Sequence, residues 1–283
     1  MSPPGRPKGE YRSAQHEGSP VNLYRLHRGA SPLIVDVPHA GTFVPPAVAA
    51  RLAAIALTCP DADWHVDRLY AFAPATGATL MVATHSRIVA DLNRDPSGAA
   101  LYPGADNTEL CPTRTFANDA IYRDGEVPGA QEIAARRATY FDPYHDALAA
   151  EVERVHARHG YAVLLDGHSI RSQVPRFFAG QLPDLNLGTA GGASCAPGLQ
   201  EAAVTVLAGA AGFSHVVNGR FKGGYVTRRY GRPAQRVHAL QLEIAQCAYM
   251  DEAPPCRWDA ARAAPLAAVL RRLVDTLTAW RPA

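Results

Sequence analysis

Short apolar runs alternate along the chain with longer segments whose apolar residues recur every three or four positions. The runs are rich in leucine and β-branched residues and are bounded by glycine or proline, which is typical of buried parallel strands. We expect strands at 33–37, 79–83, 162–166, 215–218 and 238–244. Strands that alternate with helices predict an α/β fold, here a single domain with a central mixed, largely parallel sheet flanked by helices.

The spacing of apolar residues predicts helices over 46–54, 67–75, 131–159, 198–211 and 260–280. Gly160 is well placed to end the longest of them, because glycine readily adopts the left-handed conformation found after many helices. Pro143 should kink or interrupt the same helix, since proline has no amide hydrogen to donate. Two long stretches, 95–128 and 169–197, show little periodicity, and loops of this length are usually functional lids or binding loops.

Composition narrows the class of protein. The chain has 283 residues, and we expect residues 21–283 to form one catalytic domain behind a disordered, polar tail at 1–20. A net charge of +2 gives no reason to expect nucleic acid or a membrane surface as partner. The sequence has no run of about 18 apolar residues, so no transmembrane helix is expected. Five cysteines without a Cys-x-x-Cys pair fit a reducing cytoplasm.

Two histidines stand just after predicted strands, His39 after 33–37 and His168 after 162–166. Ligands bind beyond the carboxyl ends of such strands in open α/β sheets. We therefore interpret the pair as metal ligands. A hydrolytic zinc takes three protein ligands and leaves a fourth position for water. The third should be a carboxylate or histidine from the acidic stretch 59–67, where the candidates are Asp61, Asp63, His65 and Asp67. Asp63 is our choice, because Asp67 is placed to begin the next helix. The alternative is an acidic helix start with no metal.

Glu243 lies within the apolar segment 239–245. A carboxylate in such a segment should be paired, metal-bound or functional, because burying it unpaired is costly. Partial burial would raise its pKa toward the range of a general base. The alternative is a solvent-facing glutamate on an edge strand. Ser169, within Gly-His-Ser-Ile-Arg, is a weak candidate nucleophile, since the second glycine of Gly-x-Ser-x-Gly is missing.

An asparagine and an arginine stand side by side at Asn93 and Arg94. A guanidinium beside an amide can bind both oxygens of a carboxylate, although a surface salt bridge is an alternative. The segment 219–231 is basic and rich in glycine, and it contains Arg220 and Arg228. It suits a loop that closes over an anionic substrate, and a solvated hairpin fits it equally well.

Taken together, these motifs resemble the N-formylglutamate amidohydrolase (deformylase) family of bacterial histidine degradation. The matching segments run in order from about residue 32 to 250, at 37–41, 63–70, 91–94, 165–169, 183–188, 218–225 and 241–243. The resemblance implies a fold like that of zinc carboxypeptidases and aspartoacylases, of the phosphorylase/hydrolase-like type. It implies His39 and His168 as zinc ligands, a carboxylate from the second motif as the third, and Glu243 as the catalytic glutamate.

The carboxypeptidase relatives carry a ligand three residues after the first histidine, but that position is Thr42 here and cannot serve. This departure leaves the third ligand to Asp63 or Asp67. The resemblance also implies that Asn93 and Arg94 hold a carboxylate of the substrate.

The activity that the resemblance implies is hydrolysis of N-formyl-L-glutamate to formate and L-glutamate, the last step of a histidine degradation route. The expected metal is zinc, although cobalt and iron accept the same donors. This small dicarboxylate substrate needs a second cation beyond Arg94, for which the candidates are Arg176, Arg220 and Arg228. Two alternatives remain: a deacylase of another N-acyl amino acid, like aspartoacylase or succinylglutamate desuccinylase, and a non-catalytic anion-binding protein on the same fold.

Overall fold

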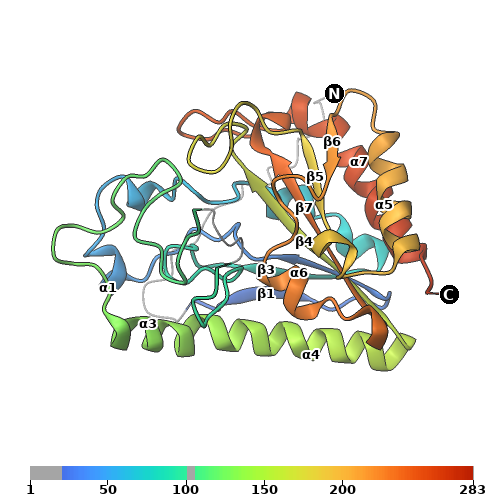
Figure 1. Ribbon diagram of the computed structural model, residues 1–283, viewed down its shortest axis with the longest axis horizontal. Coiled ribbons are helices and arrows are strands. Elements are labelled where there is room, and N and C mark those ends of the chain that lie inside the picture. Colours follow the sequence, from blue (N-terminus) through green and yellow to red (C-terminus); the bar gives the residue numbers. More distant parts are fainter. Residues whose placement is uncertain (1–20, 101–105, 283) are drawn as a thin grey trace, which may run out of the picture.

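A seven-stranded sheet forms the centre of the part that the computed structural model describes, residues 21–100 and 106–282 (Figure 1). Its strand order is β1–β3–β2–β4–β7–β5–β6. The strands are β1 (Tyr24–His27), β2 (Leu33–Val37), β3 (Thr79–Ala83), β4 (Ala162–Ile170), β5 (Leu185–Gly188), β6 (His215–Val217) and β7 (Val237–Ala245). Strands β3, β2, β4 and β7 run parallel, whereas β1 pairs with β3 and β5 pairs with β7 in antiparallel fashion. The predicted mixed, largely parallel sheet is confirmed, and the predicted tail at 1–20 lies outside the described residues.

The two central strands are longer than the sequence pattern indicates. Strands β2 and β3 have the predicted bounds, but β4 continues to Ile170 and β7 to Ala245, and every residue of both is buried. His168 therefore lies within a strand and not after it, as the pattern implied. The unpredicted strands β1 and β5 are only four residues long and contain few apolar residues.

The helices are α1 (Pro46–Ala49), α2 (Val66–Leu69), α3 (Ala130–Arg136), α4 (Asp142–His159), α5 (Pro197–Ala208), α6 (Tyr225–Tyr230) and α7 (Ala260–Ala279). The predicted helix 131–159 is interrupted, as expected near Pro143, by a π-helical turn over Arg137–Phe141. Gly160 ends it with a φ of 75°. The predictions for 46–54 and 67–75 were too long, because separate 3₁₀ turns follow α1 and α2 at Ala56–Thr58 and Ala73–Thr76. Helix α6 was not predicted.

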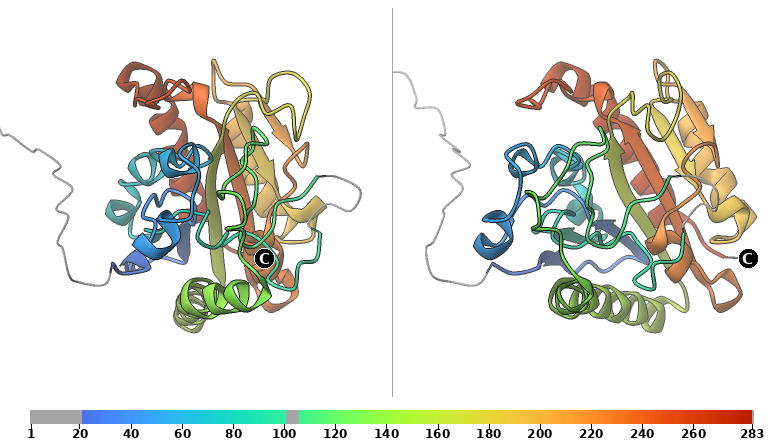
Figure 2. Two further views of the ribbon diagram at one scale, coloured as in Figure 1. Left: turned by 90° about the vertical axis from the view of Figure 1, so that its left-hand side faces the viewer. Right: turned by 60° about the vertical axis from the view of Figure 1, so that its left-hand side comes forward.

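Helices cover both faces of the sheet, which explains why the central strands are apolar on both sides. Alternate residues of β2 point to opposite faces. Leu33 and Val35 pack in the core with α5 and α7, while Ile34 packs with α4 on the other side. Figures 1 and 2 show α4 along one side of the sheet and α5 and α7 along the opposite side. Burial of one such side chain contributes about 1.5–3 kcal/mol.

The carboxyl ends of β2, β4 and β7 meet at one edge of the sheet. The parallel register of β4 and β7 places His168 opposite Glu243. The loops at this edge share a small apolar cluster that includes Ile170, Phe177 and Phe221. This edge is where the sequence predicted the site. Within the described ranges, no helix is long and apolar enough to cross a membrane.

Candidate metal centre

Three buried side chains, His39, Asp63 and His168, meet at the carboxyl edge of the sheet. Their nearest donor atoms all lie within 4.8 Å of one another. Asp63 reaches the centre from the loop before α2, which is tied to β2 by a 3.0 Å bond from the Asp63 amide to the His39 carbonyl. Asp63 Oδ2 lies 2.9 Å from His168 Nδ1 and 3.8 Å from His39 Nδ1. Asp67 instead faces away and accepts a 2.7 Å hydrogen bond from Arg25.

The outer nitrogens of both imidazoles face carboxylates. His39 Nε2 lies 2.8 Å from Asp91 Oδ1, and His168 Nε2 lies 2.7 Å from Asp166 Oδ1. In this arrangement the Nδ1 atoms point to the centre, as metal-ligating histidines do when their other nitrogen donates to a carboxylate. His39 Nδ1 and Asp63 Oδ1 are buried and have no hydrogen-bond partner among the described residues. Such atoms are costly unless satisfied, so this donor set fits a divalent metal ion.

Arg87 brings a buried positive charge to the centre. Its Nη2 donates a 2.7 Å hydrogen bond to Asp91, and its Nη1 lies 3.6 Å from Asp63 Oδ1. Burial alone would lower its pKa, but the two carboxylates outweigh burial and the pKa is raised. Burial would likewise raise the pKa of Asp91, but Arg87, Arg94 and His39 hold it well below its usual range. Arg87 follows no recognisable motif, and sequence reasoning missed it.

Glu243 stands beside this centre on the next strand. It is 7% exposed, and β7 lies between β4 and β5, so the alternative of an edge-strand glutamate is wrong. Gln241 Nε2 donates a 3.0 Å hydrogen bond to Glu243 Oε2. Burial raises the pKa of Glu243 to about 7. A carboxylate with this pKa can take up and return a proton near neutral pH.

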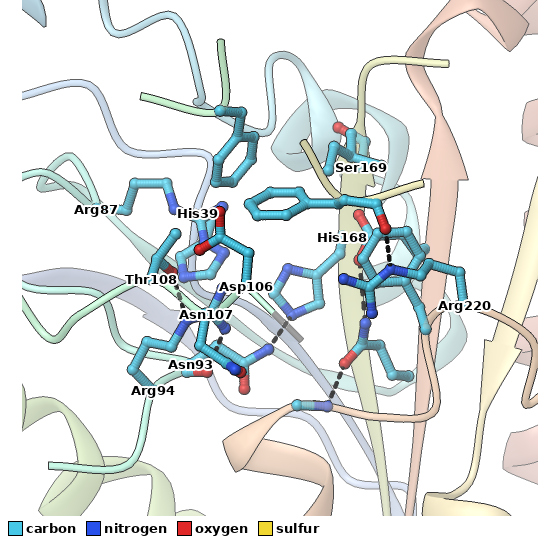
Figure 3. Close-up of a pocket in the computed structure, with 17 residues that line it drawn as sticks. His39, Arg87, Asn93, Arg94, Asp106, Asn107, Thr108, His168, Ser169 and Arg220 are labelled. Atoms are coloured by element: carbon cyan, nitrogen blue, oxygen red, sulfur yellow. Dashed lines mark hydrogen bonds between the residues drawn. The ribbon is translucent and has the colours of Figure 1, made fainter. Parts of the chain in front are cut away.

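Asn93 and Arg94 follow β3 and line the same pocket (Figure 3). The Asn93 amide is held on two sides, because Oδ1 accepts a 2.8 Å bond from the Val226 amide and Nδ2 lies 2.9 Å from His168 Nε2. Arg94 Nε donates a 2.6 Å hydrogen bond to Thr108 Oγ1. The structure therefore places the predicted asparagine against the metal centre and the predicted arginine at the pocket wall.

The three remaining candidate arginines occupy different surroundings. Arg220 lines the pocket (Figure 3). Arg176 does not line the pocket. Its guanidinium donates hydrogen bonds to both carboxylate oxygens of Asp106, at 2.7 and 3.0 Å, and so connects two loops. Arg228 is exposed, donates to the Gly223 carbonyl and lines a separate hollow. The structure thus brings one of the three into the site.

Ser169 lies beside the centre but lacks a partner that could activate it. Its hydroxyl accepts a 2.8 Å hydrogen bond from the Tyr249 hydroxyl and lies 3.3 Å from Gln246 Nε2. Neither group is a base near neutral pH. This environment does not support a serine nucleophile.

Comparison with known proteins identifies the family of this chain. Residues 31–250 match the N-formylglutamate amidohydrolase family. An N-formylglutamate deformylase of Pseudomonas aeruginosa is 49% identical over 253 residues, 89% of this chain and 95% of that protein. One of Pseudomonas putida is 45% identical over 255 residues, 90% and 95% of the two chains. The crystal structure of N-formylglutamate amidohydrolase from Ralstonia eutropha superposes with a TM-score of 0.73 at 31% identity, over 91% of this chain and 96% of that one.

Both central histidines, Asp63 and Glu243 fall inside the matched region. The family resemblance seen in the sequence motifs is confirmed. The chain is an amidohydrolase and belongs to the N-formylglutamate amidohydrolase family.

Proposed function

We propose that this protein hydrolyses N-formyl-L-glutamate to formate and L-glutamate with the help of a divalent metal held by His39, Asp63 and His168. One observation carries the proposal: a buried His–Asp–His cluster lies beside Glu243, in a chain 49% identical to an N-formylglutamate deformylase. The alignment spans 95% of that relative, so the comparison covers a whole enzyme.

The metal would supply Lewis acidity, which acidifies water and polarises a carbonyl group. Zinc is our choice because two imidazoles, one carboxylate and an open position form a common catalytic zinc site, although cobalt and iron accept the same donors. Asp91 and Asp166, which lie 2.8 and 2.7 Å from the Nε2 atoms of His39 and His168, would leave the two Nδ1 atoms to hold such an ion.

Glu243 moves the proton in this proposal. Its carboxylate takes a proton from the attacking water, whose oxygen bonds to the formyl carbon. The same proton then passes to the amide nitrogen as the carbon–nitrogen bond breaks, which gives formate and the free amine. Arg87 is placed to stabilise the negative charge that develops on the formyl oxygen. Arg94, supported by Asn93, would hold a carboxylate of the substrate.

Formate release from N-formyl-L-glutamate tests the proposal, with the purified protein assayed before chelation, after chelation and after adding zinc, cobalt or iron back. Activity should be lost and restored. N-acetyl-L-aspartate and N-succinyl-L-glutamate serve as comparison substrates, and we expect both to react more slowly. A metal-loaded protein that releases no formate would refute the function.

Metal content tests the ligand assignment separately. His39→Ala and His168→Ala should each abolish stoichiometric zinc binding, because each removes one of three donors. If both variants keep one tightly bound zinc, the metal lies elsewhere. Asp67→Ala is the matched control and should keep its zinc, since Asp67 pairs with Arg25 away from the cluster.

The cellular setting is part of the same proposal. Formate and L-glutamate are the products expected for the last step of a histidine degradation route. All five cysteines are free in the structure, which fits a reducing cytoplasm.

A further inference from the structure

We propose that Arg220 binds the side-chain carboxylate of the substrate and thereby selects an acidic side chain, while Arg94 binds the α-carboxylate. This inference rests on the proposed function and deepens it. The sequence left open which arginine is the second cation and which of the two carboxylates each arginine binds.

The pocket has two unlike walls. Figure 3 shows Arg94 and Arg220 on opposite sides of His168. The wall around Arg94 is polar and includes Asn107 and Thr108. Ile170, Phe177 and Phe221 line the pocket and belong to one apolar cluster, and the rings of Phe177 and Phe221 lie beside the Arg220 guanidinium. A glutamate side chain is two methylenes followed by a carboxylate, which matches an apolar wall that ends in a cation.

Contacts with the backbone and with two rings position Arg220. Its Nε donates a 2.6 Å hydrogen bond to the Phe177 carbonyl. Its guanidinium carbon lies 5.9 Å from the ring centroid of Phe177 and 5.6 Å from that of Phe221, within the range of cation–π attraction. Because the guanidinium is held in place, less side-chain entropy is lost when it binds a carboxylate through both oxygens.

Arg94 is better placed for the α-carboxylate. That group is attached to the same carbon as the amide nitrogen of the scissile bond, so its anchor must lie near the metal centre. Arg94 follows Asn93, which is 2.9 Å from His168, and its Nε lies 3.8 Å from Asp91, which contacts His39. Arg94 is therefore separated from each of the two histidines by a single residue, Asn93 on one side and Asp91 on the other.

Substrate selectivity distinguishes the two roles. The substrates are N-formyl-L-glutamate and N-formyl-L-glutamine, which have nearly the same shape and differ in the charge of the side chain. Arg220→Gln should lower kcat/KM for formylglutamate about 10- to 100-fold, the usual loss for a hydrogen bond to a charged group. It should leave formylglutamine within about threefold of wild type, so the preference collapses. Arg94→Gln should lower kcat/KM for both substrates to a similar extent.

Arg228→Gln is the matched control, because Arg228 comes from the same glycine-rich segment but is exposed and lines a separate hollow. It should leave kcat/KM for both substrates unchanged. Zinc content and thermal unfolding show whether each variant is folded. If Arg220→Gln does not fold, Arg220→Lys replaces it, and the loss of the planar fork should still reduce the preference for formylglutamate.

Three outcomes would overturn the assignment. Arg220→Gln could lower kcat/KM equally for both substrates, or it could leave the preference for formylglutamate intact. Arg94→Gln could instead be the variant that loses this preference. Each requires a wild-type enzyme that releases formate. A wild-type protein inactive on both substrates would instead overturn the proposed function itself.

Discussion

Asp91→Asn is the most informative single change, because Asp91 connects His39, a proposed metal ligand, to the arginines of the pocket. Its Oδ1 lies 2.8 Å from His39 Nε2 and accepts a 2.9 Å hydrogen bond from the backbone N–H of Asn93. Its Oδ2 accepts a 2.7 Å bond from Arg87, and Arg94 lies 3.8 Å away. Asparagine has the same shape but no charge, and its NH₂ group must face a donor on one of these sides.

Two separate losses follow from this geometry. His39 loses the carboxylate that orients it, which typically weakens metal binding about 10- to 100-fold, or about 1.4–2.7 kcal/mol. Arg87, 7% exposed, loses its 2.7 Å ion pair. Removing one partner of a buried pair costs about 3–5 kcal/mol. Asp63, 3.6 Å from Arg87, offsets part of this, so we expect the metal-free protein to lose about 3 kcal/mol.

The assay has two readouts. Competition with a chelator measures zinc affinity, and denaturant unfolding of the metal-free protein measures stability. Asp67→Asn is the matched control, because its pair with Arg25 has the same 2.7 Å length but its carboxylate is 35% exposed. Exposed pairs contribute about 0–1 kcal/mol, so this control should change little. If Asp91→Asn binds zinc within twofold of wild type and unfolds at the same denaturant concentration, the reasoning is refuted.

Three further changes test Glu243, the buried His145 of α4, and the close approach of Gly224 to Asn93. Glu243→Gln should lower kcat about 10²- to 10⁴-fold with zinc content unchanged, and formate release at the wild-type rate would exclude Glu243 as the base. Burial lowers the pKa of His145 to about 4, whereas the unfolded chain titrates near 6.5. Between about pH 6.5 and pH 4 the unfolded chain binds a proton at His145 that the folded protein does not. The free energy of unfolding should therefore be highest above about pH 6.5 and fall by up to about 3 kcal/mol toward pH 4, as measured by unfolding at several pH values. His145→Gln should lack this fall, and an unchanged pH profile would contradict it. A Cβ on Gly224 would lie 2.3–2.6 Å from the Asn93 amide group, so Gly224→Ala should cost about 1–3 kcal/mol in an unfolding assay. Gly198→Ala, whose nearest neighbour is 4.0 Å away, is the control, and equal stability of the two variants would argue against the clash.

The sequence predicts strands that are continuous apolar runs well and strands that contain polar residues poorly, for a physical reason. Strands β2 and β3 are apolar runs with clear ends, and their bounds agree with the prediction. Strand β4 was ended too early, at Asp166, because a buried strand is not expected to continue through polar residues. The structure buries Asp166 and His168 by placing each against the other, at 2.7 Å. Strand β1 is four residues long and half exposed, so its pairing to β3 leaves almost no hydrophobic signal.

That His39 and His168 meet at one edge of the sheet could be predicted, because strand ends and ligand sites coincide in α/β folds. The residues that orient them could not. Asp91 and Asp166 lie 2.8 and 2.7 Å from one imidazole nitrogen each, and no periodicity in the sequence encodes which nitrogen faces inward. Arg87 could not be predicted either, because its charge becomes important only where the fold buries it between Asp63 and Asp91.

The arginines show most clearly where sequence reasoning ends. Arg176, Arg220 and Arg228 all come from segments of the sequence that are rich in glycine or proline, and residue type alone did not distinguish them as partners of a substrate carboxylate. Arg176 forms an ion pair with Asp106, which lies 70 positions earlier in the chain. Arg228 faces away from the pocket, within the same segment that brings Arg220 into it. A guanidinium binds whichever carboxylate the fold brings to it, so the role of an arginine depends on long-range packing. Selectivity between N-formyl-L-glutamate and N-formyl-L-glutamine therefore tests the fold of this loop as directly as it tests the chemistry of Arg220.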